Sequence, residues 1–187
     1  MANESLFDGT LDRRALMARA ILLVGGAVAG VPGLAFASAP TKSFFTPPER
    51  AVLDAVCEGL IPRTDTPGAL DVGVPAFIDA MMINWAEPAT AGAFRGVLKK
   101  IDGAAQAAGG RGFASLPPDQ RAELLKTHDA AAFAAKDKVW RRFKTLALTA
   151  YYLSEPGATQ ELRYELSPGI WEPAIRIGPD TRAWSGW

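Results

Sequence analysis

Between residues 46 and 152 the apolar residues recur three or four positions apart, the spacing that places them on one face of an α-helix. These periodic stretches mostly begin at a proline, which suits the first helical turn, and several end at proline or glycine. The pattern predicts helices from Pro47 to just before Pro62, from Pro75 onward, and over about 88–108, 118–128 and 130–152.

No stretch alternates apolar and polar residues for long, as a half-buried strand would. Residues 162–166 could pair locally, but one short strand makes no sheet. The sequence therefore predicts an all-α fold, a small bundle of about five helices.

The faces of these helices follow from the same spacing. The first helix begins with Thr46 and Glu49, the two positions of a capping box. The helix from Pro75 is expected to bury its apolar residues through Trp85, and the 130–152 helix is expected to bury a series that starts at Phe133.

Residues 167–187 differ in character from the predicted bundle of residues 38–166. This extension is rich in proline and glycine, lacks periodicity and contains Trp171, Trp184 and Trp187. Because a disordered tail is usually poor in aromatic residues, we expect an extended arm that docks on something. Its docking site is either a partner or the chain's own bundle, and the sequence favours neither.

Residues 1–37 have the three parts of an export signal. Arg13 and Arg14 precede an uncharged Gly- and Ala-rich run, and small residues follow it. The paired arginines indicate the twin-arginine route, which implies the twin-arginine translocase as a partner and a periplasmic destination. Ala35 and Ala37 form the better cleavage site, with the mature chain starting at Ser38, because cleavage after Ala39 would place Pro40 behind the scissile bond.

Two other readings of this region are open. The uncharged stretch 20–39 reaches the length of about 20 residues that a membrane anchor needs, so it could remain as a tether to the inner membrane. Its glycines and Pro32 weaken the helix, and no stop-transfer charges follow it. A buried N-terminal helix is the third reading.

Composition narrows the possible functions. The chain has 20 basic and 20 acidic residues, and residues 1–37 hold three of each, so the remaining 150 residues are also neutral. A neutral chain lacks the positive surface typical of nucleic-acid binding. One cysteine, Cys57, and one histidine, His128, exclude an internal disulfide, the ordinary zinc sites, haem attachment and an iron–sulfur cluster. The sequence thus predicts no cofactor or metal site on this chain.

No set of residues forms a convincing active site. Cys57 lies on the apolar face of a helix, where a thiol is usually buried and inert. His128 is expected at the C-terminal end of a helix, where an imidazolium suits the helix dipole. The carboxylates of Asp65, Asp71 and Asp79 surround the first loop, where turn or cap roles are more common than catalysis.

Several motifs resemble those of one family, that of gluconate 2-dehydrogenase subunit 3. The most specific is Leu60–Ala69 (LIPRTDTPGA) together with Val74–Asp79 (VPAFID), and looser ones are Leu116–Arg121 (LPPDQR) and Tyr151–Gly157 (YYLSEPG). The resemblance spans about residues 45–164, nearly all of the predicted bundle.

This resemblance implies a non-catalytic small subunit of a periplasmic dehydrogenase that oxidises a sugar or sugar acid. Its partner would be a large flavoprotein of the glucose–methanol–choline type, which holds the FAD and any iron–sulfur cluster, and a cytochrome c subunit with haem often takes the electrons onward. The small subunit would stabilise the flavoprotein and escort it, already folded, through the twin-arginine pathway. The family's small subunits can also carry a cysteine that bridges to the large subunit, a role not transferred to Cys57 because of its helix-face position.

If the resemblance holds, the partner-facing residues are expected on the first loop and the arm, at Arg63, Asp65, Trp171, Trp184 and Trp187. Two other functions compete with it. One is an independent periplasmic enzyme or small-molecule binder that uses the 63–79 region, and the other is a structural module tethered to the membrane by residues 20–39.

Overall fold

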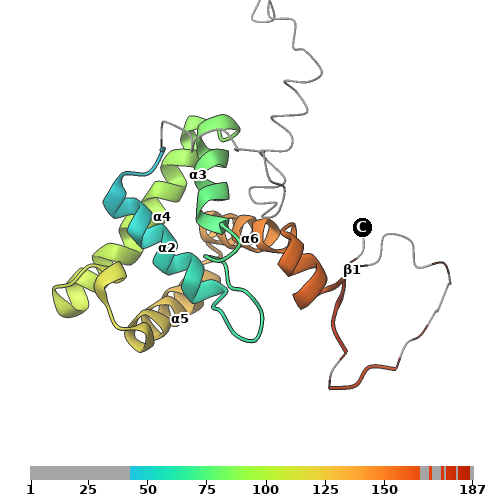
Figure 1. Ribbon diagram of the computed structural model, residues 1–187. Helices are drawn as coiled ribbons and strands as arrows, with labels where there is room; N and C mark the ends of the chain where they lie inside the picture. Colours follow the sequence, from blue (N-terminus) through green and yellow to red (C-terminus); the bar gives the residue numbers. More distant parts are fainter. Residues whose placement is uncertain (1–42, 165–168, 170–173, 175, 180, 186–187) are drawn as a thin grey trace, which may run out of the picture. The chain divides into compact units, whose positions relative to one another are not determined.

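The computed structural model describes residues 43–164, 169, 174, 176–179 and 181–185, and this part of the chain is mostly helical (Figure 1). Its elements are α2 (Pro47–Leu60), α3 (Val74–Asn84), α4 (Pro88–Gly109), the 3₁₀ turn η1 (Phe113–Ser115), α5 (Pro118–Ala134), α6 (Lys138–Tyr152), the π-helical turn η2 (Gly157–Glu161), β1 (Arg163–Tyr164) and β2 (Trp184–Ser185). The all-α prediction is confirmed. The predicted export signal, residues 1–37, lies outside the described residues.

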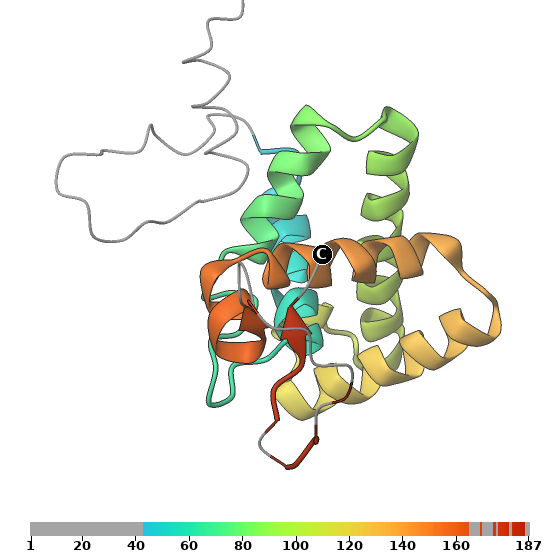
Figure 2. The same cartoon turned by 90° about the vertical axis from the view of Figure 1, so that its right-hand side faces the viewer.

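The helices pack around one apolar core. Helix α2 contacts α3, α4 and α5, while α6 runs across α3 and α4 (Figure 2). Aromatic rings connect the elements: Phe143 of α6 meets Phe94 of α4 edge to face at 5.4 Å between ring centroids and stacks on Trp140 at 5.7 Å. Both Phe143 and Trp140 are buried, so the helix that crosses the bundle is held mainly by apolar burial.

The predicted helix starts are largely correct. Pro47, Pro88 and Pro118 each begin a helix, and the Glu49 carboxylate accepts a hydrogen bond from the Thr46 N–H at 3.1 Å, as the capping-box pattern predicts. Helix α3 begins one residue before the expected Pro75, directly after Gly73, whose φ of 75° lies in the left-handed region that favours glycine.

The prediction of one helix over 130–152 is wrong. The chain turns between Ala134 and Lys138, so that the first five of these residues extend α5 and the rest form α6. Lys136 adopts a left-handed φ of 53°, and the Asp137 carboxylate caps α6 by accepting from the N–H groups of Val139 and Trp140 at 2.8 and 3.1 Å. An aspartate within the apolar period was the sequence signal for this second helix start.

Two aromatic residues that were expected to be buried are exposed. Phe133 belongs to the last turn of α5, not to the periodic face of α6, and its exposed fraction is 86%. Trp85 follows the last residue of α3 as its C-cap, and its exposed fraction is 66%. Trp85 therefore lies beyond the end of α3, and Phe133 lies on a helix other than the one whose apolar period it was assigned to.

The segment near residue 163, which the sequence suggests could pair locally, does pair, but with a distant part of the chain. Strand β1 pairs in parallel with β2, with Arg163 opposite Trp184 and Tyr164 opposite Ser185. The partner strand comes from the end of the predicted arm, 20 residues further on, and this long-range pairing has no local signal in the sequence.

No helix in the described ranges is long and apolar enough to cross a membrane. This result does not test the 20–39 tether, which falls outside those ranges.

His128 does not occupy a helix C-terminus as predicted, because α5 continues to Ala134. Its ring packs edge to face on Trp140 at 4.8 Å, and its Nε2 is buried without a hydrogen-bond partner among the described residues. Burial lowers the pKa of His128 below its ordinary value, and the nearby Lys100 cation lowers that pKa further. The side chain is therefore adapted to the neutral form.

A pH-dependent loss of stability follows from this shift. The unfolded chain takes up a proton on His128 near pH 6.5, whereas the folded chain resists it to a lower pH, so the free energy of unfolding falls as the pH drops below about 6.5. Urea unfolding at about pH 7.5 and about pH 5.5 should show a larger loss for the wild type than for His128→Gln. Carboxylates titrate mostly below this window and affect both proteins alike, so equal losses would contradict the interpretation.

Candidate functional site

The loop between α2 and α3 carries two of the predicted interface residues, Arg63 and Asp65. The Asp71 carboxylate closes the loop by accepting from Arg63 Nε at 2.9 Å and from the Gly68 N–H at 2.8 Å, and a second Arg63 nitrogen also contacts it. The Arg63 hydrogen bond, with help from Gly68, lowers the pKa of Asp71. Arg63 therefore shapes the loop while its side chain stays largely exposed.

Gly68 cannot be replaced at this turn without moving the backbone. A Cβ there would lie 2.6 Å from the backbone nitrogen of Arg63, because the two sides of the loop approach each other closely. The Ala69 N–H donates to the Ile61 carbonyl at 2.9 Å across this approach. This close approach explains the Pro-Gly pair in the loop in physical terms.

The C-terminal end of α6 and the turn η2 pack against this loop. Tyr151 Oη donates to the Pro67 carbonyl at 2.8 Å, and Thr66 Oγ1 donates to Glu161 at 2.9 Å. Between them is a shallow hollow of about 350 Å³. Two motifs that lie more than 80 residues apart in the sequence therefore form one surface.

Gly157 allows the tight turn of the Tyr151–Gly157 motif. A Cβ at this position would lie 2.2 Å from the Tyr151 carbonyl oxygen, since the chain folds back directly over the end of α6. No larger residue fits that turn without displacing backbone.

The end of the arm also reaches this region. Arg182 donates from Nη1 to the carbonyls of Thr159 and Gln160 at 2.7 and 3.0 Å, and β2, which contains Trp184, follows directly. Loop, η2 and strand pair thus form one continuous surface, here called the loop–arm surface (Pro62–Asp71, Gly157–Tyr164 and Arg182–Ser185).

The predicted interface residues divide into three groups. Arg63 and Trp184 belong to elements that meet at the loop–arm surface, and Arg63 is already engaged by Asp71. Asp65 is exposed and makes no hydrogen bond or ion pair within the part of the chain that the structure describes. Trp171 and Trp187 lie outside the described residues.

The side chains of this surface can form hydrogen bonds and ion pairs. Its hollow is lined by hydroxyl, carboxylate, guanidinium and amide groups, without a nucleophile paired to a base. Cys57 is buried in α2, as expected, and burial raises the pKa of its thiol to about 12, so the reactive thiolate is disfavoured. Within the described ranges no three His, Cys, Asp or Glu side chains gather in a way that could hold a metal ion.

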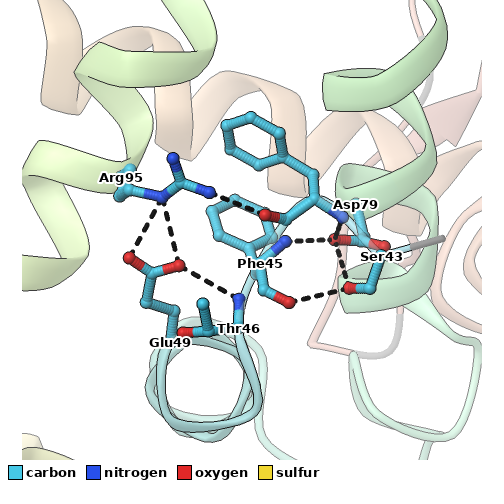
Figure 3. Close-up of polar contacts among 7 residues, drawn as sticks. Ser43, Phe45, Thr46, Glu49, Asp79 and Arg95 are labelled. Carbon is cyan, nitrogen blue, oxygen red and sulfur yellow. Dashed lines mark hydrogen bonds and ion pairs between the residues drawn. The ribbon is translucent and has the colours of Figure 1, made fainter.

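Sequence reasoning missed a second polar cluster, which holds the chain just before α2 (Figure 3). Asp79 is buried in α3, and its Oδ1 accepts from Ser43 Oγ and from the N–H groups of Phe44 and Phe45 at 3.0–3.1 Å. The sequence places Asp79 near the first loop, yet its side chain serves a segment more than 30 residues upstream. A lone carboxylate in the apolar stretch 74–83 was the available signal.

Arg95 of α4 completes this cluster. It donates to the Phe44 carbonyl at 2.6 Å, pairs with Glu49 at 3.0 Å, and its guanidinium lies 4.2 Å from the centre of the Phe44 ring. Asp79 thus satisfies the N–H groups of residues 44 and 45, while Arg95 satisfies a carbonyl, so the segment that follows residue 42 is fixed between α3 and α4.

Comparison with known proteins assigns the class of this chain. The family model of gluconate 2-dehydrogenase subunit 3 matches residues 47–169, and the chain belongs to that family. It is therefore related to subunits of a dehydrogenase complex. Neither the search of curated proteins nor the search of solved structures found a match.

Removing the Asp79 carboxylate should destabilise the fold. Asp79→Ala leaves the N–H groups of Phe44 and Phe45 without an acceptor, while the Ser43 hydroxyl keeps the Phe45 carbonyl, so the variant should lose about 2–4 kcal/mol of unfolding free energy. Asp79→Asn keeps one oxygen acceptor and should cost less. Urea unfolding of the purified variants measures both. Equal, small losses would show that the cluster contributes little.

Two glycine substitutions test the backbone packing at Gly157. Gly157→Ala should cost at least about 2 kcal/mol because of the clash with the Tyr151 carbonyl. Gly96→Ala, in the exposed interior of α4 with open space around the new methyl, should instead stabilise by about 0.5–1 kcal/mol. Thermal unfolding would contradict the packing argument if both variants shifted in the same direction.

Proposed function

We propose that this chain is the non-catalytic small subunit of a periplasmic, FAD-dependent dehydrogenase for a sugar, glucoside or sugar acid. In this proposal it binds and stabilises the large flavoprotein subunit and escorts it through the twin-arginine pathway. The FAD, with any iron–sulfur cluster or haem, belongs to partner subunits, one of which can be a cytochrome c. The observation that carries the proposal is the family match over residues 47–169.

The predicted export signal, residues 1–37, gives the small subunit a role in the export of the complex. A flavoprotein acquires FAD as it folds in the cytoplasm, and the twin-arginine route moves folded cargo. If the large chain lacks its own signal, Arg13 and Arg14 of the small chain would export both.

The loop–arm surface is the proposed contact with the flavoprotein. It unites the most specific family motif with the arm, and exposed loop residues on a rigid scaffold commonly carry recognition. Asp65 and Trp184 are the residues that we assign to this contact, with Arg63 holding the loop in shape. Trp171 and Trp187 remain assigned to it from the sequence alone.

The export role can be tested in the native host by changing both arginines. Arg13→Lys/Arg14→Lys should leave the flavoprotein folded with FAD but retained in the cytoplasm, as followed by dehydrogenase activity in cell fractions. Arg19→Lys, in the same leader but outside the pair, is the matched control and should export normally. Normal export of the flavoprotein by the double variant would refute the escort role.

A further inference from the structure

A second surface feature lies away from the loop–arm surface, on the other half of α6. It is an open groove of about 630 Å³ between the C-terminal half of α3, the start of α4 and the middle of α6. Its apolar lining consists of the buried Met82 and Phe94 and the more exposed Met81, Trp85 and Leu146. Here it is called the α3–α6 groove.

The groove exposes apolar area that the bundle does not cover. Trp85 is 66% exposed at the end of α3, although a tryptophan usually contributes a large buried area in a folded protein. Leu146 of α6 and Met81 of α3, which also line the groove, are only partly buried. An exposed tryptophan beside partly buried apolar groups is typical of a protein interaction site.

The charges at the groove are unbalanced. Arg141 and Arg142 are exposed and have no ion-pair partner in the part of the chain that the structure describes. Five other cations, Arg50, Arg63, Arg95, Arg121 and Lys144, each contact a carboxylate, whereas Arg111 and Lys126, for example, have no ion pair among the described residues. The wall also includes one acid, Glu87. The groove therefore offers two free guanidinium groups beside an apolar lining.

We propose that the α3–α6 groove binds a segment of the large dehydrogenase subunit that presents an apolar side chain flanked by carboxylates. The apolar side chain would pack on the apolar lining beside Trp85, and the carboxylates would pair with Arg141 and Arg142. The identity of this partner rests on the proposed function, whereas the chemistry of the segment rests on the groove.

Continuity with the proposed contact surface supports this choice of partner. Helix α6 lines the groove from Arg141 to Thr149 and, at Tyr151, holds the loop of the loop–arm surface. A stable interface needs about 800 Å² on each partner, more than one groove supplies, so a partner that spans both surfaces is the physically reasonable one.

A second copy of this chain fits the groove less well. In a two-fold symmetric dimer the same patch meets itself, so four arginines from the two copies would share one interface with only two carboxylates, those of Glu87. Such like-charge contacts oppose association.

The first test uses charge reversal and the flavoprotein that co-purifies with the chain from its native host. Arg141→Glu/Arg142→Glu should weaken binding to that flavoprotein at least about tenfold and reduce its dependence on salt. Trp85→Ala should weaken binding without changing the salt dependence. The matched control is Arg111→Glu/Lys126→Glu, the same charge change at two exposed positions outside the groove.

The outcomes separate the two proposals. Unchanged affinity in both groove variants, with a normal wild-type complex, would overturn the groove assignment alone. If the wild-type chain brings down no flavoprotein, the proposed function fails and this inference fails with it. Circular dichroism of each variant distinguishes lost contact from lost fold.

A photo-crosslinking residue at the exposed Thr145 tests the occupant directly. The expected product is a crosslink to a flavoprotein peptide that contains Asp or Glu close to an apolar residue. A crosslink to another copy of this chain or to its own residues 165–187, or protection of the groove by a small molecule instead, would overturn the proposal.

Discussion

The rest of the structure depends on the burial of the apolar face of α6 against α3 and α4. Phe143 is fully buried, meets Phe94 of α4 and stacks on Trp140, and truncating such a ring costs about 3–5 kcal/mol in a typical core. A domain of this size has only about 5–15 kcal/mol of net stability. Both the loop–arm surface and the α3–α6 groove use α6, so their geometry depends on this one packing contact.

Polar side chains hold two backbone segments in place around that apolar core. Asp79 and Arg95 hold the backbone that leads into α2, and Asp71 holds the first loop. Asp79 and Arg95 satisfy backbone groups that would otherwise lie beside the core without partners, which costs more than a net hydrogen bond returns, whereas Asp71 satisfies a backbone N–H in a largely exposed loop. Their contribution is mainly to select one path for the chain at the two places where it has no regular secondary structure.

These features suit a subunit that works by contact. The loop–arm surface is rigid and polar, because a carboxylate, two close backbone approaches and the Tyr151 hydroxyl hold it. The α3–α6 groove is apolar and cationic, with Trp85 exposed beside it. A partner that covers both would gain apolar area from one and orientation from the other, which is the usual division between the core and the rim of an interface.

The sequence by itself determined most of the helices, their start residues, the burial of Cys57 and the family, because these follow from local spacing, proline positions and contiguous motifs. It did not reveal that the chain turns at Lys136, since the apolar period continues across the turn and only Asp137 marks it. The tertiary structure alone decided that Asp79 serves residues 43–45, that Tyr151 holds Pro67, and that β1 pairs with β2. These contacts join residues between about 20 and 80 positions apart, and their partners are chosen by how the helices cross, a property that no local pattern encodes.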